Sequence, residues 1–261
     1  MRNLRRYLKD AGVGIATLAV FLLLWELLAR AVNSPFIPGP YEVALAFVRL
    51  ATVGDFDGYT LLEHSEVSIY RVLLGFIAGT VTAVPLGLVM GLKPTVKTAA
   101  NTIIEPMRFI PPIAWIPLSI VLLLGLSRYV FLLWIGTFFP ILLNTIAGVR
   151  HTSPTLVNVA KTFGASNSEI TTKIVLPSAL PEIMTGLRVG LGIGWMCIVA
   201  AEMLGGDPVG LGRLILKYAN FLQIDAVIVG MVLIGVIGMA MNYIILILEK
   251  KMFKYRVEVL T

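Results

Sequence analysis

Long apolar stretches alternate with short polar ones along most of this chain, and their lengths are those of membrane helices. A window of about 19 residues separates about six apolar segments. They lie at residues 11–31, 69–92, 103–125, 129–149, 183–204 and 227–248. Each is close to the roughly 20 residues that a helix needs to cross the hydrocarbon core of a bilayer. The pattern predicts an all-α integral membrane protein with about six transmembrane helices and no separate soluble domain.

The third segment, 103–125, is unusual because it is rich in proline. Its prolines are Pro106, Pro111, Pro112 and Pro117. Proline removes a backbone donor and breaks helices. Non-helical backbone is tolerated at membrane depth only where protein or a water-filled cavity covers it. The segment is therefore predicted to be either a broken span or a re-entrant one.

Composition and charge support a membrane protein and indicate its orientation. Hydrophobic residues make up 57% of the chain and charged residues 14%, more apolar surface than a soluble domain of this length could hide. With six crossings, most Lys and Arg fall on the side of the N-terminus, residues 93–102 and 150–182, and the C-terminal tail. The other side holds only Arg49, Arg128, Arg213 and Lys217. Because basic residues concentrate in the cytosol, both termini are predicted to be cytosolic, and the net charge of +6 does not indicate nucleic-acid binding.

Two further patterns concern packing. Residues 41–52 place their apolar positions largely on one side of a helix, which predicts an amphipathic helix at the membrane interface. Glycines recur at four-residue spacing as Gly75/Gly79, Gly87/Gly91 and Gly186/Gly190/Gly194. This spacing lets helix backbones approach closely. It indicates tight packing within one bundle, or a seam between two copies of the chain along the fifth segment.

The chain lacks the motifs of several enzyme classes. No Gly-Lys dipeptide occurs, so the phosphate-binding loop of many ATPases is absent. His64 and His151 fall on opposite sides of the membrane in this topology and cannot share a metal ion. No H-E-x-x-H, C-x-x-C or G-x-S-x-G motif occurs, and no apolar segment carries a His that could activate a nucleophile. We therefore expect a protein that is not itself an enzyme and that holds no metal or cofactor.

Ionisable residues in the apolar segments are the remaining candidates for chemistry, because a charge in a bilayer usually has a partner or lines water. Glu202 and Arg188, in the fifth segment, are either structural residues or part of a solute path. Arg108 is the cation nearest the proline break, where it either compensates an anion or reaches to the headgroups. Arg71, near the outer end of the second segment, is predicted to be an interface anchor.

The longest polar run, residues 158–181, reads NVAKTFGASNSEITTKIVLPSALP. A small residue, Gly four positions later, Ile ten positions after that and then x-Leu-Pro is a spacing that resembles the cytoplasmic loop of bacterial and archaeal ABC importer permeases. In that family the loop forms two short helices, one of which docks in a cleft of the ATPase subunit. Short helices can form around Gly164, and Pro177 can end this element before the next span. Within the loop 150–182, the resemblance implies an ATPase-coupling role for Ala160, Gly164, Ala165, Ser166, Glu169, Ile174, Leu176 and Pro177.

Other segments extend the resemblance over nearly the whole chain. FIPGPYEV, SIYRVLLGF, EPMRFIPPIAWIPL and LPSALPEIMTGLRVGLGIGW resemble the subgroup of permeases for nitrate, sulfonates, taurine and bicarbonate. The resemblance implies that residues 1–261 are a single permease domain of the type I importer kind, in the cell membrane and its lipid. It also implies a homodimer, an extracytoplasmic binding protein, and separate ATPase subunits that bind the ATP and Mg. Irregular backbone at membrane depth lines cavities, and a charge in a span often lines water, so the residues predicted for the solute path are Arg108, Pro111, Pro112, Trp115, Trp195 and Glu202.

Three alternatives stay open at this point. A permease of this family could carry a vitamin precursor or another small organic solute instead of an oxyanion. A secondary carrier or channel would not need the loop at 150–182, and its transport would survive ATP depletion. A membrane enzyme would instead depend on polar residues within the spans.

Overall fold

The computed structural model describes residues 2–252, with side chains described from Gly12 onward, and this part of the chain contains helices but no strand. The first half holds α1 (Arg2–Val32), α2 (Pro40–Thr52), α3 (Leu61–Leu92), α4 (Pro94–Arg108), the 3₁₀ helix η1 (Pro112–Trp115), α5 (Ile116–Leu122) and α6 (Leu126–Arg150). The second half holds α7 (Pro154–Thr162), α8 (Asn167–Ile170), the π-helical turn η2 (Thr171–Val175), α9 (Leu176–Leu204), α10 (Leu211–Asn220) and α11 (Ile224–Met252). The predicted all-α membrane fold is confirmed.

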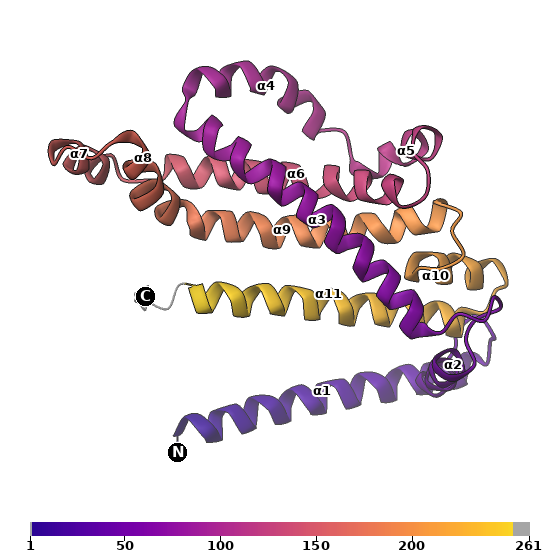
Figure 1. The fold of residues 1–261 in the computed structure, drawn as a ribbon. Helices are drawn as coiled ribbons and strands as arrows, with labels where there is room; N and C mark the ends of the chain where they lie inside the picture. Colours follow the sequence, from indigo (N-terminus) through magenta and orange to yellow (C-terminus); the bar gives the residue numbers. More distant parts are fainter. Residues whose placement is uncertain (1, 253–261) are drawn as a thin grey trace.

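Five of the six predicted spans are long continuous helices. The described chain has five helices long and apolar enough to cross a membrane, in α1, α3, α6, α11 and the continuous stretch that ends in α9. The third predicted span is instead divided into α4, η1 and α5 (Figure 1). It starts where α3 ends and brings the chain to the start of α6, at the opposite end of the bundle. The proline-rich segment thus runs from one end of the bundle to the other in three pieces, as a broken crossing would.

Proline chemistry accounts for the position of the break. Pro111 and Pro112 have no N–H, so neither can donate to the carbonyls of Met107 and Arg108 that continuation of α4 would require. The backbone bends after Arg108 and resumes as one 3₁₀ turn from Pro112. Three separate helical pieces thus occupy the place of one straight span.

The glycine rows explain why α3, α6 and α9 pack so closely. A side-chain carbon on Gly87 of α3 would lie 2.7 Å from Cβ of Thr145 of α6. On the other side of α6, a carbon on Gly186 of α9 would lie 2.8 Å from Cβ of Asn144. The remaining glycines of both rows also face α6, which is therefore clasped between two helices of its own chain. This finding supports packing within one bundle and overturns the reading of the fifth-span glycines as a seam between copies.

The two ends of this bundle differ in what they carry. We call them the α7 end, which bears α7 and α8, and the α10 end, which bears α2 and α10 (Figure 1). The start of α1 and the end of α11 both lie towards the α7 end (Figure 1). His64, at the start of α3, and His151, after α6, lie at opposite ends, as the predicted topology requires.

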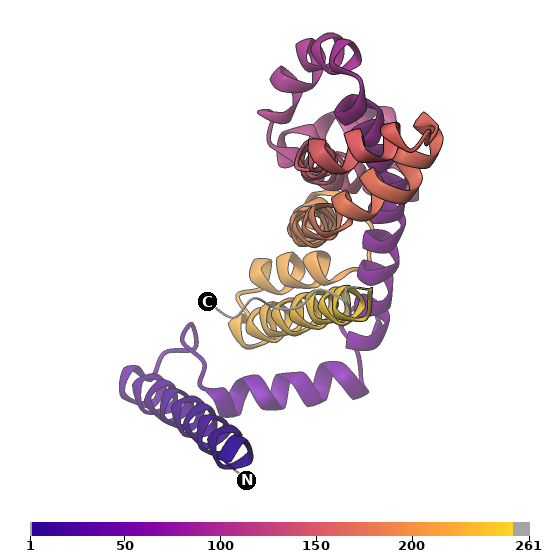
Figure 2. The ribbon, with the colours of Figure 1, turned by 90° about the vertical axis from the view of Figure 1, so that its left-hand side faces the viewer.

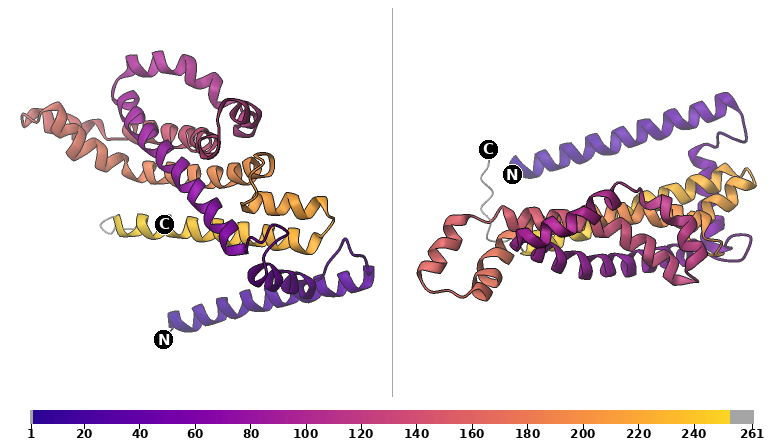
Figure 3. Two further views of the ribbon diagram at one scale, coloured as in Figure 1. Left: turned by 45° about the vertical axis from the view of Figure 1, so that its right-hand side comes forward. Right: turned by 90° about the horizontal axis from the view of Figure 1, so that it is seen from above.

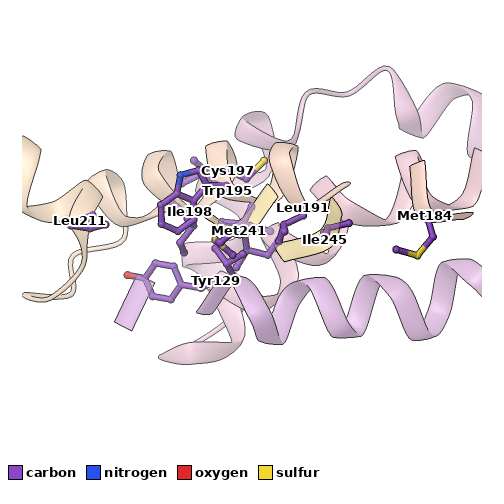
Figure 4. Close-up of a cluster of buried hydrophobic side chains, with 14 residues drawn as sticks. Tyr129, Met184, Leu191, Trp195, Cys197, Ile198, Leu211, Met241 and Ile245 are labelled. Atoms are coloured by element: carbon purple, nitrogen blue, oxygen red, sulfur yellow. The ribbon is translucent and has the colours of Figure 1, made fainter. Parts of the chain in front are cut away.

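A hydrophobic core joins α6, α9 and α11 near the middle of the bundle. Tyr129 of α6, Ile198 of α9 and Met241 of α11 belong to one buried cluster, drawn in Figure 4. A second cluster at the α10 end includes Ala46 and Leu50 of α2, which pack with α10 and α11. The predicted amphipathic helix over residues 41–52 is present as α2. Ala46 and Leu50 bury one side of it on the chain, while Phe47 and Val48 stay exposed.

Helix α1 stands apart from the other long helices and reaches them only through α2 (Figures 2 and 3). Only 6% of its most apolar window is buried, against 56% for α6. Trp25 Nε1 donates to the carbonyl of Pro38 at 3.0 Å, and the Tyr41 N–H donates to Glu26 at 3.3 Å. These contacts fix the end of α1 to the connector that follows it.

Candidate functional site

The polar run predicted to touch a partner forms two short helices, α7 and α8, which project beyond α6 and α9 at the α7 end (Figure 1). The turn between them centres on Gly164, whose φ is +80°. The Gly164 N–H donates to the carbonyl of Lys161 at 2.9 Å, and the Ala165 N–H donates to that of Ala160 at 3.0 Å. These two bonds form the Schellman arrangement that ends a helix at a residue with positive φ, where glycine is favoured.

The start of α8 is closed by a reciprocal cap. Ser166 Oγ accepts the N–H of Glu169 at 3.3 Å, and Glu169 Oε2 accepts the N–H of Ser166 at 3.0 Å. Lys173 Nζ donates to the other Glu169 oxygen at 3.0 Å. This capping box satisfies backbone donors that a helix start leaves open. The predicted coupling residues Ser166 and Glu169 therefore shape the segment, whatever else they contact.

The junction with α9 corrects the expectation for Pro177, which does not end the element. Residues Asn167–Leu204 form one continuous helical stretch, and Pro177 lies in the first turn of α9. The Leu176 N–H donates to the carbonyl of Thr171, five residues back, in the turn η2. This wider turn directly precedes Pro177, so the hydrogen bond that Pro177 cannot donate is lost beside a place where the regular helical pattern is already interrupted. Sequence reasoning treated Pro as a stop and did not foresee the π turn.

A small hydrophobic cluster anchors this segment to the bundle. Val149 of α6, Ile170 of α8 and Val175 of η2 are buried together, and the half-buried Ala160, Ala165 and Leu176 pack against them. Two other predicted coupling residues differ in exposure, since Ile174 is half-buried and Gly164 exposed. The cluster ties both short helices to α6 and α9.

Sequence reasoning missed an apolar stripe on the free face of α7. Leu156, Val159 and Phe163 are all exposed, and the Phe163 side chain is 86% accessible. They stand three and four residues apart, a spacing that places them on one face of a helix. That spacing within a polar run was the signal that could have identified them.

The broken crossing borders a cavity of about 270 Å³ against α6 and α9. Its lining includes Arg108, Phe109 and Pro112 from the break, Phe139 and Leu143 from α6, and Ile193 from α9. Arg108 Nε donates to Glu105 Oε2 at 2.8 Å, Nη2 lies 2.8 Å from the same oxygen in an ion pair, and the Arg108 side chain is 33% accessible. The structure thus brings Arg108 and Pro112 of the predicted path together at one cavity.

The other predicted path residues lie elsewhere. Trp115 packs edge-on against Phe131, with ring centroids 6.2 Å apart. Trp195 lines a different cavity, of about 210 Å³, between α9 and α11, and its Nε1 donates to the carbonyl of Ile234 at 3.0 Å. Pro111 is exposed beside the break. Arg188 lines that second cavity and lies 3.6 Å from Glu249.

Glu202 belongs to a buried ion cluster at the α10 end. Arg71 Nη1 donates to Glu202 Oε1 at 2.8 Å, Ser68 Oγ donates to the same carboxylate at 2.9 Å, and the Gly212 N–H donates at 3.0 Å. Arg71 also donates to Asp207 at 2.9 Å and lies 4.0 Å from the centre of the Tyr129 ring. These partners favour the structural reading of Glu202 over a place on a solute path.

The expectation for Arg71 was wrong, because this residue is buried and not an interface anchor. It is only 7% exposed and holds two carboxylates at once. Ser68 and Arg71 precede Gly75 by seven and four residues, so all three share the face of α3 that packs inward. The glycine row marked this buried face in the sequence, and Arg71 could have been placed on it.

A second ion cluster fixes α10 to the loop before α3. Lys217 of α10 donates to both Asp55 and Asp57, and Asp55 lies 3.3 Å from the ring of His64. Burial tends to raise the pKa of Asp55, but hydrogen bonds from Lys217 and from backbone N–H groups outweigh it and hold this pKa below its ordinary value. Burial tends to lower the pKa of Lys217, and the two carboxylates outweigh it and raise that pKa. The pair is therefore charged over a wide pH range.

Comparisons with known proteins now define the family. Residues 83–254 match the family described as "Binding-protein-dependent transport system inner membrane component". The chain is 40% identical to a Methanocaldococcus jannaschii chain named as an ABC transporter permease protein, over 95% of this chain and 93% of that one. It is 33% identical to the taurine transport system permease protein of Escherichia coli, over 96% and 92% of the two chains. It is 32% identical to the nitrate import permease protein of Synechocystis, over 89% and 86%.

The fold has a solved counterpart. The inward-facing MetNI methionine ABC transporter matches with a TM-score of 0.59 and 19% identity, over 71% of this chain and 94% of that one. The chain therefore belongs to the inner membrane component family of binding-protein-dependent transport systems. It is the multi-pass permease subunit of an ABC importer, a transport component that works with ATPase and substrate-binding partners.

Proposed function

We propose that this permease carries a small oxyanion, such as a sulfonate, taurine, nitrate or bicarbonate, as a homodimer on two ATPase subunits. The similar permeases named for taurine and nitrate support this solute class. An extracytoplasmic binding protein delivers the solute, and lipid surrounds the dimer. The chain is not a catalyst itself, because ATP and Mg bind to the ATPase subunits.

One observation carries the coupling part of this proposal: α7 presents an apolar stripe outward while its base is fixed to the bundle. Leu156, Val159 and Phe163 are exposed at the tip. An exposed apolar patch rimmed by polar residues is typical of a protein contact site. The ATPase subunit would bury this stripe, since the coupling loop of the family docks there.

The anchoring contacts give the loop its mechanical role. Ile170 and Val175 pack on Val149 of α6, and α8 runs through η2 into α9 without interruption. Movement of α7 would therefore be transmitted to both α6 and α9. Closure of the ATPase subunits on ATP would move α7, and the bundles would turn between inward and outward access.

Charge and geometry together support an orientation for this chain. The α7 end carries the basic segments of the predicted cytosolic side, so we place this end and both termini in the cytosol. The test uses a Cys197→Ala background with single cysteines at Asn158 of α7 and at Val53 after α2, both exposed. We expect an impermeant maleimide to label Val53→Cys from outside and Asn158→Cys only after permeabilisation. Labelling of both from one face would disprove this topology.

The decisive test of function is reconstitution with the cognate ATPase and binding protein. We expect uptake of labelled taurine, methanesulfonate, nitrate or bicarbonate into vesicles that depends on ATP and on both partners. Uptake that persists without ATP or without the ATPase subunit would identify a carrier or channel. ATP-driven uptake of an uncharged organic solute, with none of the oxyanions transported, would retain the importer and overturn the solute class.

A further inference from the structure

The cavity beside the broken crossing combines one cation with apolar walls. Arg108 is the charged residue of its lining, and the aromatic rings of Phe109 and Phe139 lie among the walls together with Leu143 and Ile193. At about 270 Å³ it is slightly smaller than the roughly 300–1,000 Å³ of sites that hold drug-sized ligands. The space therefore suits a solute of a few heavy atoms beyond an anionic head.

The Arg108 guanidinium has donors left for a ligand. Nε donates to one oxygen of Glu105, and Nη2 lies 2.8 Å from the same oxygen in an ion pair. A guanidinium offers five N–H donors, and the described side chains, from Gly12 to Met252, include no hydrogen-bond partner of Nη1. The Nη1–Nη2 edge can thus receive two oxygens of a sulfonate or carboxylate. The Glu105 carboxylate offsets part of the positive charge, so the anion would be held weakly, as a transport path requires.

The walls discriminate between kinds of anion. A bare inorganic oxyanion loses hydration when it enters the cavity, and it has no hydrocarbon part that could contact the apolar walls in return. An anion with a short hydrocarbon body gains from the same walls, by about fourfold in affinity per methylene group. Lining chemistry of this kind favours an organic anion over nitrate.

We propose that this cavity is a transient binding site for a small organic sulfonate. Its oxygens pair with Arg108, and its short hydrocarbon body lies against Phe109, Phe139 and Leu143. The inference rests on the proposed function, since it places the solute of that importer at a particular site. Among the oxyanions of the proposed function, the inference identifies the sulfonates as the solute of this importer.

The test measures binding to the purified permease–ATPase complex in nanodiscs of phosphatidylcholine. The probes are straight-chain 1-alkanesulfonates of one to six carbons, sodium nitrate, and 1-alkanols of matching length. We expect the sulfonate Kd to fall about fourfold per methylene until the cavity is full. Nitrate should not compete, and each alkanol should bind at least about tenfold more weakly than the sulfonate of equal length. Equal binding by nitrate, or no effect of chain length, would overturn the proposal.

Variants locate the site and separate its two halves. Leu143→Phe should fill the cavity and remove the chain-length effect, while Leu73→Phe, the same change on the exposed face of α3, should leave it intact. Arg108→Gln should remove the preference for sulfonate over alkanol but keep the chain-length effect, and Arg108→Lys should restore part of the preference. A chain-length effect that survives Leu143→Phe would place the binding elsewhere and overturn the proposal.

Two further measurements separate a failure of this site from a failure of the importer. If phosphatidylglycerol in the nanodisc displaces the sulfonates competitively, the cavity takes a lipid headgroup and the proposal fails. Binding-protein-stimulated ATP hydrolysis is recorded on the same samples. Normal stimulation without sulfonate binding refutes only this site, whereas a permease that neither retains nor stimulates the ATPase refutes the proposed function.

Discussion

The two ends of the bundle handle their polar groups in opposite ways. At the α10 end, Arg71 and Glu202 are buried and satisfied within the chain. At the α7 end, the Lys173–Glu169 pair is exposed and Phe163 points its ring into open space. The Arg71–Glu202 pair is thus completed within the single chain, whereas the α7 end exposes both an ion pair and an aromatic ring. We therefore expect substitutions in the α10-end ion cluster to reduce stability, and substitutions at the α7 end to affect contact with the ATPase subunit.

The largest effect should come from breaking the buried ion cluster. Arg71→Met leaves the Glu202 carboxylate buried without its cation, and removal of one partner of a buried pair typically costs about 3–5 kcal/mol. We expect a large fall in the thermal unfolding midpoint in detergent and little folded protein at 37 °C.

The matched control for this prediction is the double variant Arg71→Met with Glu202→Met. Replacing a buried pair by apolar side chains is far less costly than removing one partner. The double variant should therefore be more stable than Arg71→Met alone. If the single variant unfolds like the wild type, the α10 end is not the stability centre and the comparison fails.

At the other end, Gly164→Val should separate coupling from folding. A side-chain carbon at Gly164 would meet nothing within 4 Å, so only the φ of +80° opposes the substitution. A β-branched residue in that conformation costs about 1–2 kcal/mol, enough to distort the α7–α8 turn. We expect normal insertion and unfolding midpoint but a strongly reduced solute uptake per ATP hydrolysed.

Asparagine provides the control at the same position, because its side chain tolerates positive φ better than valine does. Gly164→Asn should retain most of the coupled uptake. Equal loss of coupling in both variants would show that side-chain bulk in the ATPase contact, and not backbone conformation, is decisive. Full coupling in Gly164→Val would show that the Schellman turn is not needed.

Some of the features behind these predictions could be predicted from the sequence, and others could not. Helix length and apolar content follow directly from the chain, so most spans and both short helices were predictable. The turn at Gly164 was also predictable, because glycine is favoured at positive φ. The π turn before Pro177 was not predictable. It lies where one continuous helix, packed on α6 through both α8 and α9, accommodates a proline.

The candidate site was predictable only in part. Arg108 was found because the nearby prolines must break the helix. The burial of Arg71 and the isolation of Trp195 from the break depend on which face of each helix meets its neighbour. Those faces are set by long-range packing around α6, and the glycine rows were the one local sign of it.

A smaller effect is expected from truncating the exposed stripe. Phe163→Ala should leave the unfolding midpoint unchanged, because the ring is 86% accessible. It should weaken ATPase association by about 1–2 kcal/mol, the loss typical when an aromatic anchor of an interface is removed. Titration of detergent-purified permease with the ATPase subunit measures this directly. Phe221→Ala, the same change at an exposed site of the α10 end, serves as the control and should bind normally.

The last comparison concerns two lysine ion pairs, one buried at the α10 end and one exposed at the α7 end, and the exposed pair should give the smallest effect. Asp55 has a pKa below its ordinary 3.8, so it contributes stability that is full above that pH and is lost as pH falls through the lowered value. Lys217 has a pKa above its ordinary 10.5, so its contribution is full below that pH and is lost as pH rises through the raised value. Between these limits the pair should give a stability that does not vary with pH.

Lys217→Met and Lys173→Met compare the two ends by one and the same change. Lys217→Met should lower the unfolding midpoint by a constant amount from about pH 5 to pH 9, and the gap from the wild type should shrink below about pH 4 as Asp55 protonates. Lys173→Met removes a partner of an exposed pair, and such pairs contribute at most about 0.5 kcal/mol because water and salt screen them. Its midpoint should follow the wild type at every pH. A Lys173→Met midpoint as low as that of Lys217→Met would mean that the α7 end is stabilised by its own charges, and the contrast between a self-contained end and a partner-binding end would no longer hold.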